Sequence, residues 1–298
     1  MNRFSIKDIE VLTGIKQHTL RIWEQRYNLP QPKRTATNIR YYDGSDLKLL
    51  LNVSMLNRFG IKISKITKLN EDEMERMVLT YMEKENSACV VMESLINAML
   101  RIDEVAFEKT ITKNILQHGL EKTILEVVFP FLKRIGILWQ SGSINPAYEH
   151  FISNLVKQKL MVAIDGQSKL LHSDSKKFIL FLPAGEPHEI GLLFANYLIR
   201  SRGYHSIYLG QNLPLNDLNS VYKVYPAHVI VSVITSSLKL KDVQEFIKSM
   251  SEQFPQTKII LSGNHLLNRG LIIPKNVMIV EDMERFIRIL DSLELHLQ

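Results

Sequence analysis

Residues 19–50 read TLRIWEQRYNLPQPKRTATNIRYYDGSDLKLL, and this stretch decides the fold of the N-terminal part of the chain. Its first residues continue a helix that we expect to begin near Lys16. The middle of the stretch is basic, interrupted by prolines and compatible with β structure toward its end, which predicts a two-stranded wing. The closing DGSD, residues 43–46, can cap a long helix that runs to about Met55.

A shorter helix is predicted upstream, over residues 5–14. Ser5 can serve as its N-cap with Asp8 three residues later, and Gly14 can supply the left-handed turn that ends it. Two short helices joined by a turn that contains glycine are typical of a helix-turn-helix. Three side chains of this block are expected in its core rather than on DNA, namely Leu20, Trp23 and Tyr42.

The basic residues are concentrated at the N-terminus. Residues 1–70 carry 13 Lys and Arg against 5 Asp and Glu, whereas the rest of the chain carries 24 against 26. The net charge of +6 therefore comes from the first quarter of the sequence. A localised basic surface is expected where a protein neutralises nucleic-acid phosphates.

The quoted stretch resembles the winged helix of the MerR family, whose pattern is LRxWExRxxLxxPxRxxxxxRxYxxxDL. The resemblance implies that the second helix enters the major groove of a double-stranded DNA operator while the wing grips the flanking backbone. The candidate DNA-contacting residues are Lys16, Gln17, His18 and Arg21 on the helix, and Arg34, Arg40 and Tyr41 in the wing. Tyr41 either contacts phosphate or packs, and Arg26 could equally pair with Glu24 or another local acid.

Residues 71–169 repeat apolar side chains at three- and four-residue spacing, which predicts four antiparallel helices. One constellation in this block suggests a ligand, a tryptophan followed after nine residues by Glu-His: Trp139, Glu149 and His150. The Gly-Ser stretch 141–143 and Pro146 let the chain turn back, so that both ends of the motif can face one pocket. The Trp offers a flat apolar wall, and the Glu-His pair offers polar contacts.

From about Lys176 onward, short apolar runs alternate with helical segments, which predicts a doubly wound parallel sheet. Ligands of such sheets bind beyond the carboxyl ends of the strands. The loops expected there are 184–191, 210–214, 234–237 and 263–267.

The first of these loops contains Glu186, His188 and Gly191 in the pattern ExHxxG. One ring nitrogen of His188 can coordinate a metal while Glu186 accepts a hydrogen bond from the other and fixes the tautomer. Gly191 is expected to let the next helix approach closely. The pattern resembles the DxHxxG element of cobalamin-binding Rossmann-like domains, in which the His is the lower axial ligand of cobalt. The stretch Ser232-Val233-Ile234-Thr235 resembles that family's SxT/SxL element, and Gly263 stands where a Gly-Gly pair is usual.

Taken together, the blocks resemble the CarA/CarH/LitR group of MerR-type regulators. The resemblance implies a multidomain chain: a winged helix-turn-helix over 1–72, a four-helix bundle over 73–172 and a Rossmann-like α/β domain over 173–298. It implies adenosylcobalamin as cofactor, held by His188 below and covered by Trp139, Glu149 and His150 above. It further implies a homo-oligomer, dimer or tetramer, that represses its promoter in the dark and dissociates in light.

Gln140 departs from this group, because the light sensors carry a His directly after the Trp. We therefore expect the light response to be altered or absent, since an amide is a poor replacement for imidazole on cobalt. Two alternatives stay open: a regulator whose sensor domain no longer binds cobalamin and acts through protein contacts, and a corrinoid carrier of an enzyme. The second leaves the winged helix unexplained, so we expect no enzyme activity. A single cysteine, no signal peptide and no membrane span indicate a cytoplasmic protein.

Overall fold

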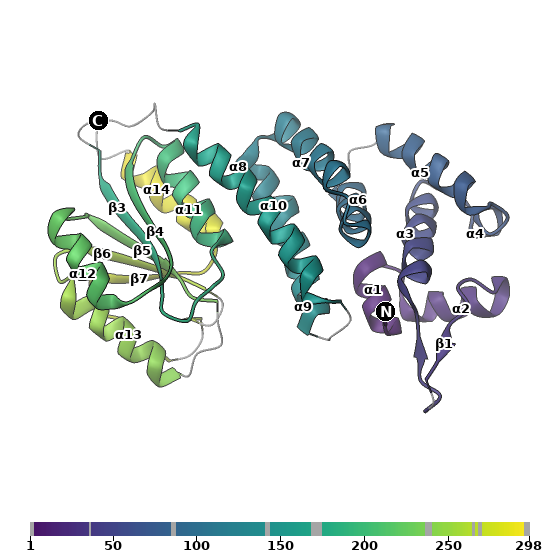
Figure 1. Ribbon diagram of the computed structural model, residues 1–298, viewed down its shortest axis with the longest axis horizontal. Helices are drawn as coiled ribbons and strands as arrows, with labels where there is room; N and C mark the ends of the chain where they lie inside the picture. The colour runs from purple at the N-terminus through teal and green to yellow at the C-terminus, as the bar shows by residue number, and fades with distance from the viewer. Residues whose placement is uncertain are drawn as a thin grey trace. The chain divides into compact units, whose positions relative to one another are not determined.

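The computed structural model divides the chain into two compact units, Met1–Leu155 and Val156–Gln298 (Figure 1). It describes residues 3–35, 37–84, 88–140, 144–167, 175–235, 240–263, 266–267 and 270–294. The domain boundaries expected at 72/73 and 172/173 stay predictions. No helix within the described ranges is long and apolar enough to cross a membrane.

The first unit opens with the predicted helix-turn-helix and wing. The elements are α1 (Ile6–Thr13), α2 (Gln17–Tyr27), β1 (Lys33–Arg34), β2 (Arg40–Tyr41), α3 (Gly44–Arg58) and α4 (Ile63–Ile66). Ser5 and Asp43 each form a capping box with the Asp three residues later, and Gly14 ends α1 at φ 74°, as expected. Reciprocal backbone bonds of 2.8 and 2.9 Å between Phe4 and Tyr42 extend the base of the wing.

The core of this region lies between the short helices and α3. Leu20, Trp23 and Tyr42 are buried, which confirms the interpretation that they are core residues. Helix α3 buries side chains on more than one face because it packs against α1 and also against helices further along the chain, α5 (Glu71–Lys84) and α6 (Ala88–Arg101). The helix-turn-helix and the helical region thus share this helix.

The helical region continues with α7 (Glu104–His118), α8 (Leu120–Thr123), the π-helical turn η1 (Ile124–Val128), α9 (Phe129–Gln140) and α10 (Pro146–Asp165). Gly119 separates α7 from α8 and Pro146 begins α10, as the sequence predicted. Pro130 does not interrupt the chain of helices, because the π turn immediately before it changes the hydrogen-bond pattern there. Helix α6 packs against both α7 and this π turn.

The second unit contains the predicted parallel sheet. Its strands are β3 (Lys177–Pro183), β4 (His205–Leu213), β5 (Val229–Val233), β6 (Lys258–Ser262) and β7 (Val277–Val280), in the order β4-β3-β5-β6-β7. Helices α11 (Ile190–Ser201) and α14 (Met283–Glu294) cover one face, and α12 (Leu215–Val224) and α13 (Leu240–Gln253) cover the other (Figure 1).

The strand order reverses between β3 and β5, so the carboxyl ends of these two strands form the switch point where ligands bind in such sheets. One expected loop is wrong in its extent. Residues 210–213 belong to β4, which continues beyond two register shifts against β3. Of the other loops, 236–237 and 264–265 lie outside the described residues.

Candidate functional sites

The structure places the predicted DNA-contacting residues of the helix at the start of α2. Lys16, His18 and Arg21 are exposed, while Gln17 is half-buried. Glu10 of α1 binds two of these residues, since its carboxylate accepts bonds from Lys16 Nζ at 3.0 Å and Gln17 Nε2 at 2.8 Å. These two bonds lower the pKa of Glu10. Glu10 therefore orders the first turn of the recognition helix, a role that the sequence pattern did not indicate.

The wing residues Arg34 and Arg40 are also exposed. Arg34 donates to the side chain of Asn38 at 2.8 Å across the turn of the wing. Arg40 lies 3.7 Å from Glu24 of α2, whose carboxylate also accepts the hydroxyl of buried Tyr42. Burial and Glu24 raise the pKa of Tyr42, so it remains a neutral donor. Glu24 thus joins the recognition helix to the wing.

Tyr41 and Arg26 were the two residues with open interpretations. The guanidinium of Arg3 lies 4.9 Å from the centre of the Tyr41 ring, so a cation–π contact packs this side chain. The carboxylate of Glu24 is engaged by Tyr42 and Arg40 instead of Arg26. Arg26 is exposed near the end of α2. The DNA contacts of all these residues stay predictions.

The Trp-Glu-His constellation is split between two helices. Trp139 lies near the end of α9 with 47% of its surface exposed, an unusual position for so large an apolar side chain. Glu149 and His150 lie in the first turn of α10, where His150 Nδ1 is 3.0 Å from Glu149 Oε2. The side chain of Gln140 and residues 141–143 lie outside the described set. That Trp139 and this pair line one pocket stays a prediction.

The ExHxxG loop follows β3 at the switch point, and its Glu-His pair is formed as the motif predicts. His188 Nδ1 lies 2.6 Å from Glu186 Oε1, and the amide of His188 donates to the same oxygen at 3.1 Å. Glu186 is 1% exposed, whereas the side chain of His188 is 59% exposed. Because an ionised carboxylate can only accept, the proton of a neutral imidazole lies on Nδ1 and leaves Nε2 as the coordinating nitrogen.

Thr235 makes a contact that the sequence did not indicate. Its amide donates to Glu186 Oε2 at 2.7 Å and its hydroxyl donates to Oε1 at 3.0 Å. Thr235, two residues beyond the end of β5, therefore holds the carboxylate that orients His188. Two neighbouring strand ends are thereby joined through one buried acid. The side chain of Glu186, one methylene longer than the Asp usual at this position, makes both connections.

Ser232 and Gly263 both lie where a ligand would approach the sheet. Ser232 is fully buried in β5, and its hydroxyl has no hydrogen-bond partner among the described residues. Gly263 follows β6 at φ 142°, and a Cβ there would meet the carbonyl oxygen of Ile234 at 1.8 Å. A side chain at Gly191 would meet only ordinary contacts at 3.6 and 3.7 Å, so the close approach expected there occurs at Gly263 instead.

Sequence reasoning missed two further contacts of the loop. Asn212, which has φ 59°, accepts the amide of Gly185 at 3.0 Å and ties the end of β4 to the loop. Glu189 accepts the hydroxyl of Tyr208 at 3.1 Å, and Lys157 of α10 lies 3.4 Å from the same carboxylate. Neither contact has a local sequence signal, because each joins residues that are far apart in the chain.

Comparisons with known proteins identify two matching stretches of the chain and two similar regulators. The family described as MerR HTH family regulatory protein matches residues 4–73, and the B12 binding domain matches residues 91–163. The HTH-type transcriptional repressor CarH of Myxococcus xanthus is 27% identical over 252 residues, 82% of this chain and 83% of that protein. The repressor CarA of the same organism is 25% identical over 241 residues, 77% of this chain and 76% of that protein.

A solved structure shows the same fold. The monomethylamine corrinoid protein of Methanosarcina barkeri superimposes with a TM-score of 0.56 at 11% identity, and the match covers 70% of this chain and all of that one. The named relatives are regulators rather than enzymes. The chain thus joins a MerR-type helix-turn-helix to a B12-binding domain and is a homologue of the CarH and CarA transcriptional repressors.

Proposed function

We propose that the protein represses transcription by binding operator DNA through its winged helix, and that adenosylcobalamin bound at His188 controls this binding. The observation that carries the proposal is the Glu186–His188 pair, a buried carboxylate that orients an exposed imidazole at the switch point of the sheet. That arrangement is the usual way in which a protein prepares a histidine as a metal ligand. Bound cobalamin would supply a cobalt centre to that imidazole.

The residues near the Glu186–His188 pair fit a cobalamin. The buried hydroxyl of Ser232 has no partner among the described residues and can bond a polar group of the nucleotide tail. Gly263 follows β6 at the same edge of the sheet, where the Ile234 carbonyl comes too close for a side chain. In the first unit, Trp139 presents an exposed ring that can stack on a ligand, and Glu149 and His150 present polar groups beside each other.

Repression, the adenosyl form and assembly into a homo-oligomer come to this chain from its similarity to CarH and CarA. The exposed basic side chains of α2 and the wing supply the DNA surface, and a small winged helix usually recognises an operator as at least two copies. Because Gln140 replaces the His that follows the Trp in the light sensors, we expect no state in which two imidazoles bind cobalt. Illumination then has a weakened effect on DNA binding or none.

Two measurements test the proposal. Adenosylcobalamin is added in the dark, and the absorption spectrum and the size of the protein are recorded before and after illumination. DNA duplexes selected from a random pool are then titrated with and without the cofactor. A His-ligated spectrum that His188→Ala abolishes, together with a change in DNA affinity, supports the proposal. Colourless protein that still binds DNA would favour the cobalamin-independent regulator, and a two-imidazole spectrum after illumination would overturn the expectation for Gln140.

A further inference from the structure

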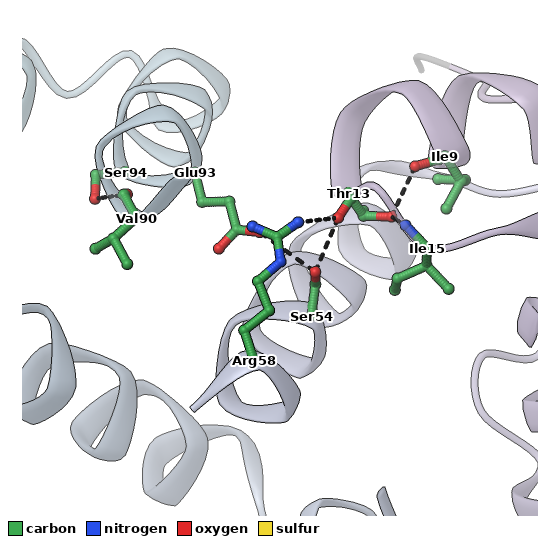
Figure 2. A network of polar contacts seen from close by, with 8 residues as sticks. All are labelled: Ile9, Thr13, Ile15, Ser54, Arg58, Val90, Glu93 and Ser94. Carbon is green, nitrogen blue, oxygen red and sulfur yellow. Dashed lines mark hydrogen bonds and ion pairs between the residues drawn. The ribbon is translucent and has the colours of Figure 1, made fainter. Parts of the chain in front are cut away.

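A buried carboxylate joins the helical region to the helix-turn-helix. Glu93 of α6 is 1% exposed, and its Oε1 lies 3.0 Å from Arg58 Nη1 and accepts the hydroxyl of Ser54 at 3.3 Å (Figure 2). Burial raises the pKa of Glu93 to about 7, while Arg58, Ser54 and Arg134 act in the opposite direction. The contact connects residues 91–163, matched by the B12 binding domain, with residues 4–73, matched by the MerR family.

The two partners of Glu93 converge on one backbone carbonyl. The single hydroxyl proton of Ser54 is shared between Glu93 and the carbonyl oxygen of Thr13, and the contact with Thr13 is the shorter one at 2.8 Å. Arg58 Nη2 donates to the same carbonyl oxygen at 3.0 Å (Figure 2). Thr13 is the last residue of α1, and Gly14 follows it in the left-handed conformation. A Cβ on Gly14 would lie 2.9 Å from Arg58 Nη2, so this glycine also makes room for the guanidinium.

The same threonine orders the turn that leads into the recognition helix. Its hydroxyl donates to the carbonyl of Ile9 at 2.8 Å and accepts the amide of Ile15 at 3.1 Å, two residues before α2 begins at Gln17 (Figure 2). The Thr13 carbonyl and hydroxyl together fix both sides of the turn between α1 and α2. A displacement of Arg58 and Ser54 would therefore reach the start of the helix that carries the predicted base contacts.

Glu93 is the group that keeps the Arg58 guanidinium in place. Burying a charged group costs free energy unless a partner of opposite charge compensates it. The ionised Glu93 carboxylate is therefore most stable when the Arg58 guanidinium stays beside it. Hydrogen bonds to charged groups are also about twice as strong as neutral ones. The side chain of Arg58 is 38% exposed. Without the charge at Glu93, its guanidinium can therefore turn toward water.

We propose that Glu93 is a positioning residue for DNA binding, which holds the Arg58 guanidinium on the Thr13 carbonyl and so lets the helical region set the turn before the recognition helix. This inference rests on the DNA-binding part of the proposed function and not on cobalamin. It assigns to α6 an effect on operator affinity although α6 carries none of the predicted DNA contacts.

The test compares full-length variants without cobalamin at pH 8, above the pKa of about 7 that burial gives Glu93, so that the wild-type carboxylate is ionised. Glu93→Gln keeps the shape of the side chain and removes its charge, and Ser54→Ala removes one of the two donors to Thr13. Ser94→Ala is the matched control, because Ser94 is the next buried residue of α6 and its hydroxyl donates back to Val90 of the same helix at 2.7 Å (Figure 2). For each variant we would measure the affinity for a selected duplex and the hydrogen exchange of the backbone amides of residues 13–22.

We expect Glu93→Gln and Ser54→Ala each to weaken DNA binding about tenfold and to speed exchange at Ile15 by a similar factor, while Ser94→Ala changes neither. The double variant should bind little worse than Glu93→Gln, since both changes act on the same carbonyl. Weaker binding with unchanged exchange at Ile15 would overturn the proposal, as would wild-type values of both in the two variants. If the wild type binds no duplex, the proposed function fails. The hydrogen exchange still tests the positioning role of Glu93 in that case, because unchanged exchange at Ile15 in both variants would reject it.

Discussion

The substitution Glu186→Gln tests the core of the proposed cobalamin site with the smallest change of shape. His188 and Thr235 donate to the carboxylate, from His188 Nδ1 at 2.6 Å and the His188 amide at 3.1 Å, and from the Thr235 hydroxyl at 3.0 Å and the Thr235 amide at 2.7 Å. An amide has one accepting oxygen, so its NH₂ must face a donor on one side or the other.

Each orientation of the amide has a predictable consequence. With the NH₂ at the Oε2 position it opposes the Thr235 amide, and the buried bond at 2.7 Å is lost. With the NH₂ at the Oε1 position, His188 Nδ1 must accept, so the ring proton moves to Nε2 and that nitrogen can no longer coordinate cobalt. Loss of one hydrogen bond to a charged group costs about 1.5–3 kcal/mol. We therefore expect cobalamin to bind about 10- to 100-fold more weakly, the range typical for residues that orient a metal-binding His.

The assay is a titration with adenosylcobalamin in the dark, followed by absorption. Glu189→Gln is the matched control, since this neighbouring carboxylate binds Tyr208 and Lys157 instead of His188. The control should bind as the wild type does, with the spectrum of a His-ligated cobalamin. Binding within twofold of the wild type by Glu186→Gln, with the same spectrum, would show that the buried carboxylate does not prepare His188 as a ligand.

Three further outcomes are expected. Gly263→Ala should lower the stability of the second unit by at least about 2 kcal/mol, since the new Cβ must displace the Ile234 carbonyl; Gly191→Ala, where the contacts are ordinary, should leave the thermal midpoint nearly unchanged. Because the folded state raises the pKa of Glu93 to about 7, the unfolded chain loses this proton at lower pH than the folded one does, and the free energy of unfolding should fall by about 3 kcal/mol as the pH rises from 4.5 to 7. Denaturant titrations of Glu93→Gln should not show this fall. An equal dependence of stability on pH in both proteins would refute the raised pKa of Glu93. Arg21→Ala should weaken DNA binding and reduce its salt dependence by about one released ion, while the cobalamin spectrum stays unchanged. The control Lys109→Ala on α7 should change neither DNA binding nor the spectrum. Parallel loss of DNA binding and cobalamin binding in Arg21→Ala would show that the two functions are not separable.

The sequence was sufficient for the elements whose signals are local. Capping residues such as Ser5 and Asp43 sit next to the helices they begin, and a buried parallel strand such as residues 177–183 reads as a continuous apolar run. The ExHxxG motif also has a local cause, since two residues of separation place the Glu and His side chains on the same loop. The fold class and the Glu186–His188 pair could therefore be predicted before the structure.

Contacts between distant segments could not be predicted in this way. Glu93 lies 35 residues from Arg58 and 39 from Ser54, and nothing in the helical pattern of α6 distinguishes it from a surface acid. The bonds from Thr235 to Glu186 likewise span 49 residues. The extent of β4 was missed because its register shifts against β3 let the strand continue through Gly210, where the sequence indicated a turn.

The departures of this chain from the cobalamin pattern have different physical meanings. Glu in place of Asp at position 186 reaches both His188 and Thr235, and the single glycine at 263 meets the close approach of the backbone at Ile234. Neither departure weakens the geometry at the strand ends. A buried carboxylate that orients an exposed imidazole costs desolvation energy, and a domain that acts only through protein contacts has no physical need for it. The structure at the switch point therefore supports the proposal of a bound ligand, and an effect of Gln140 on a response to light stays a prediction.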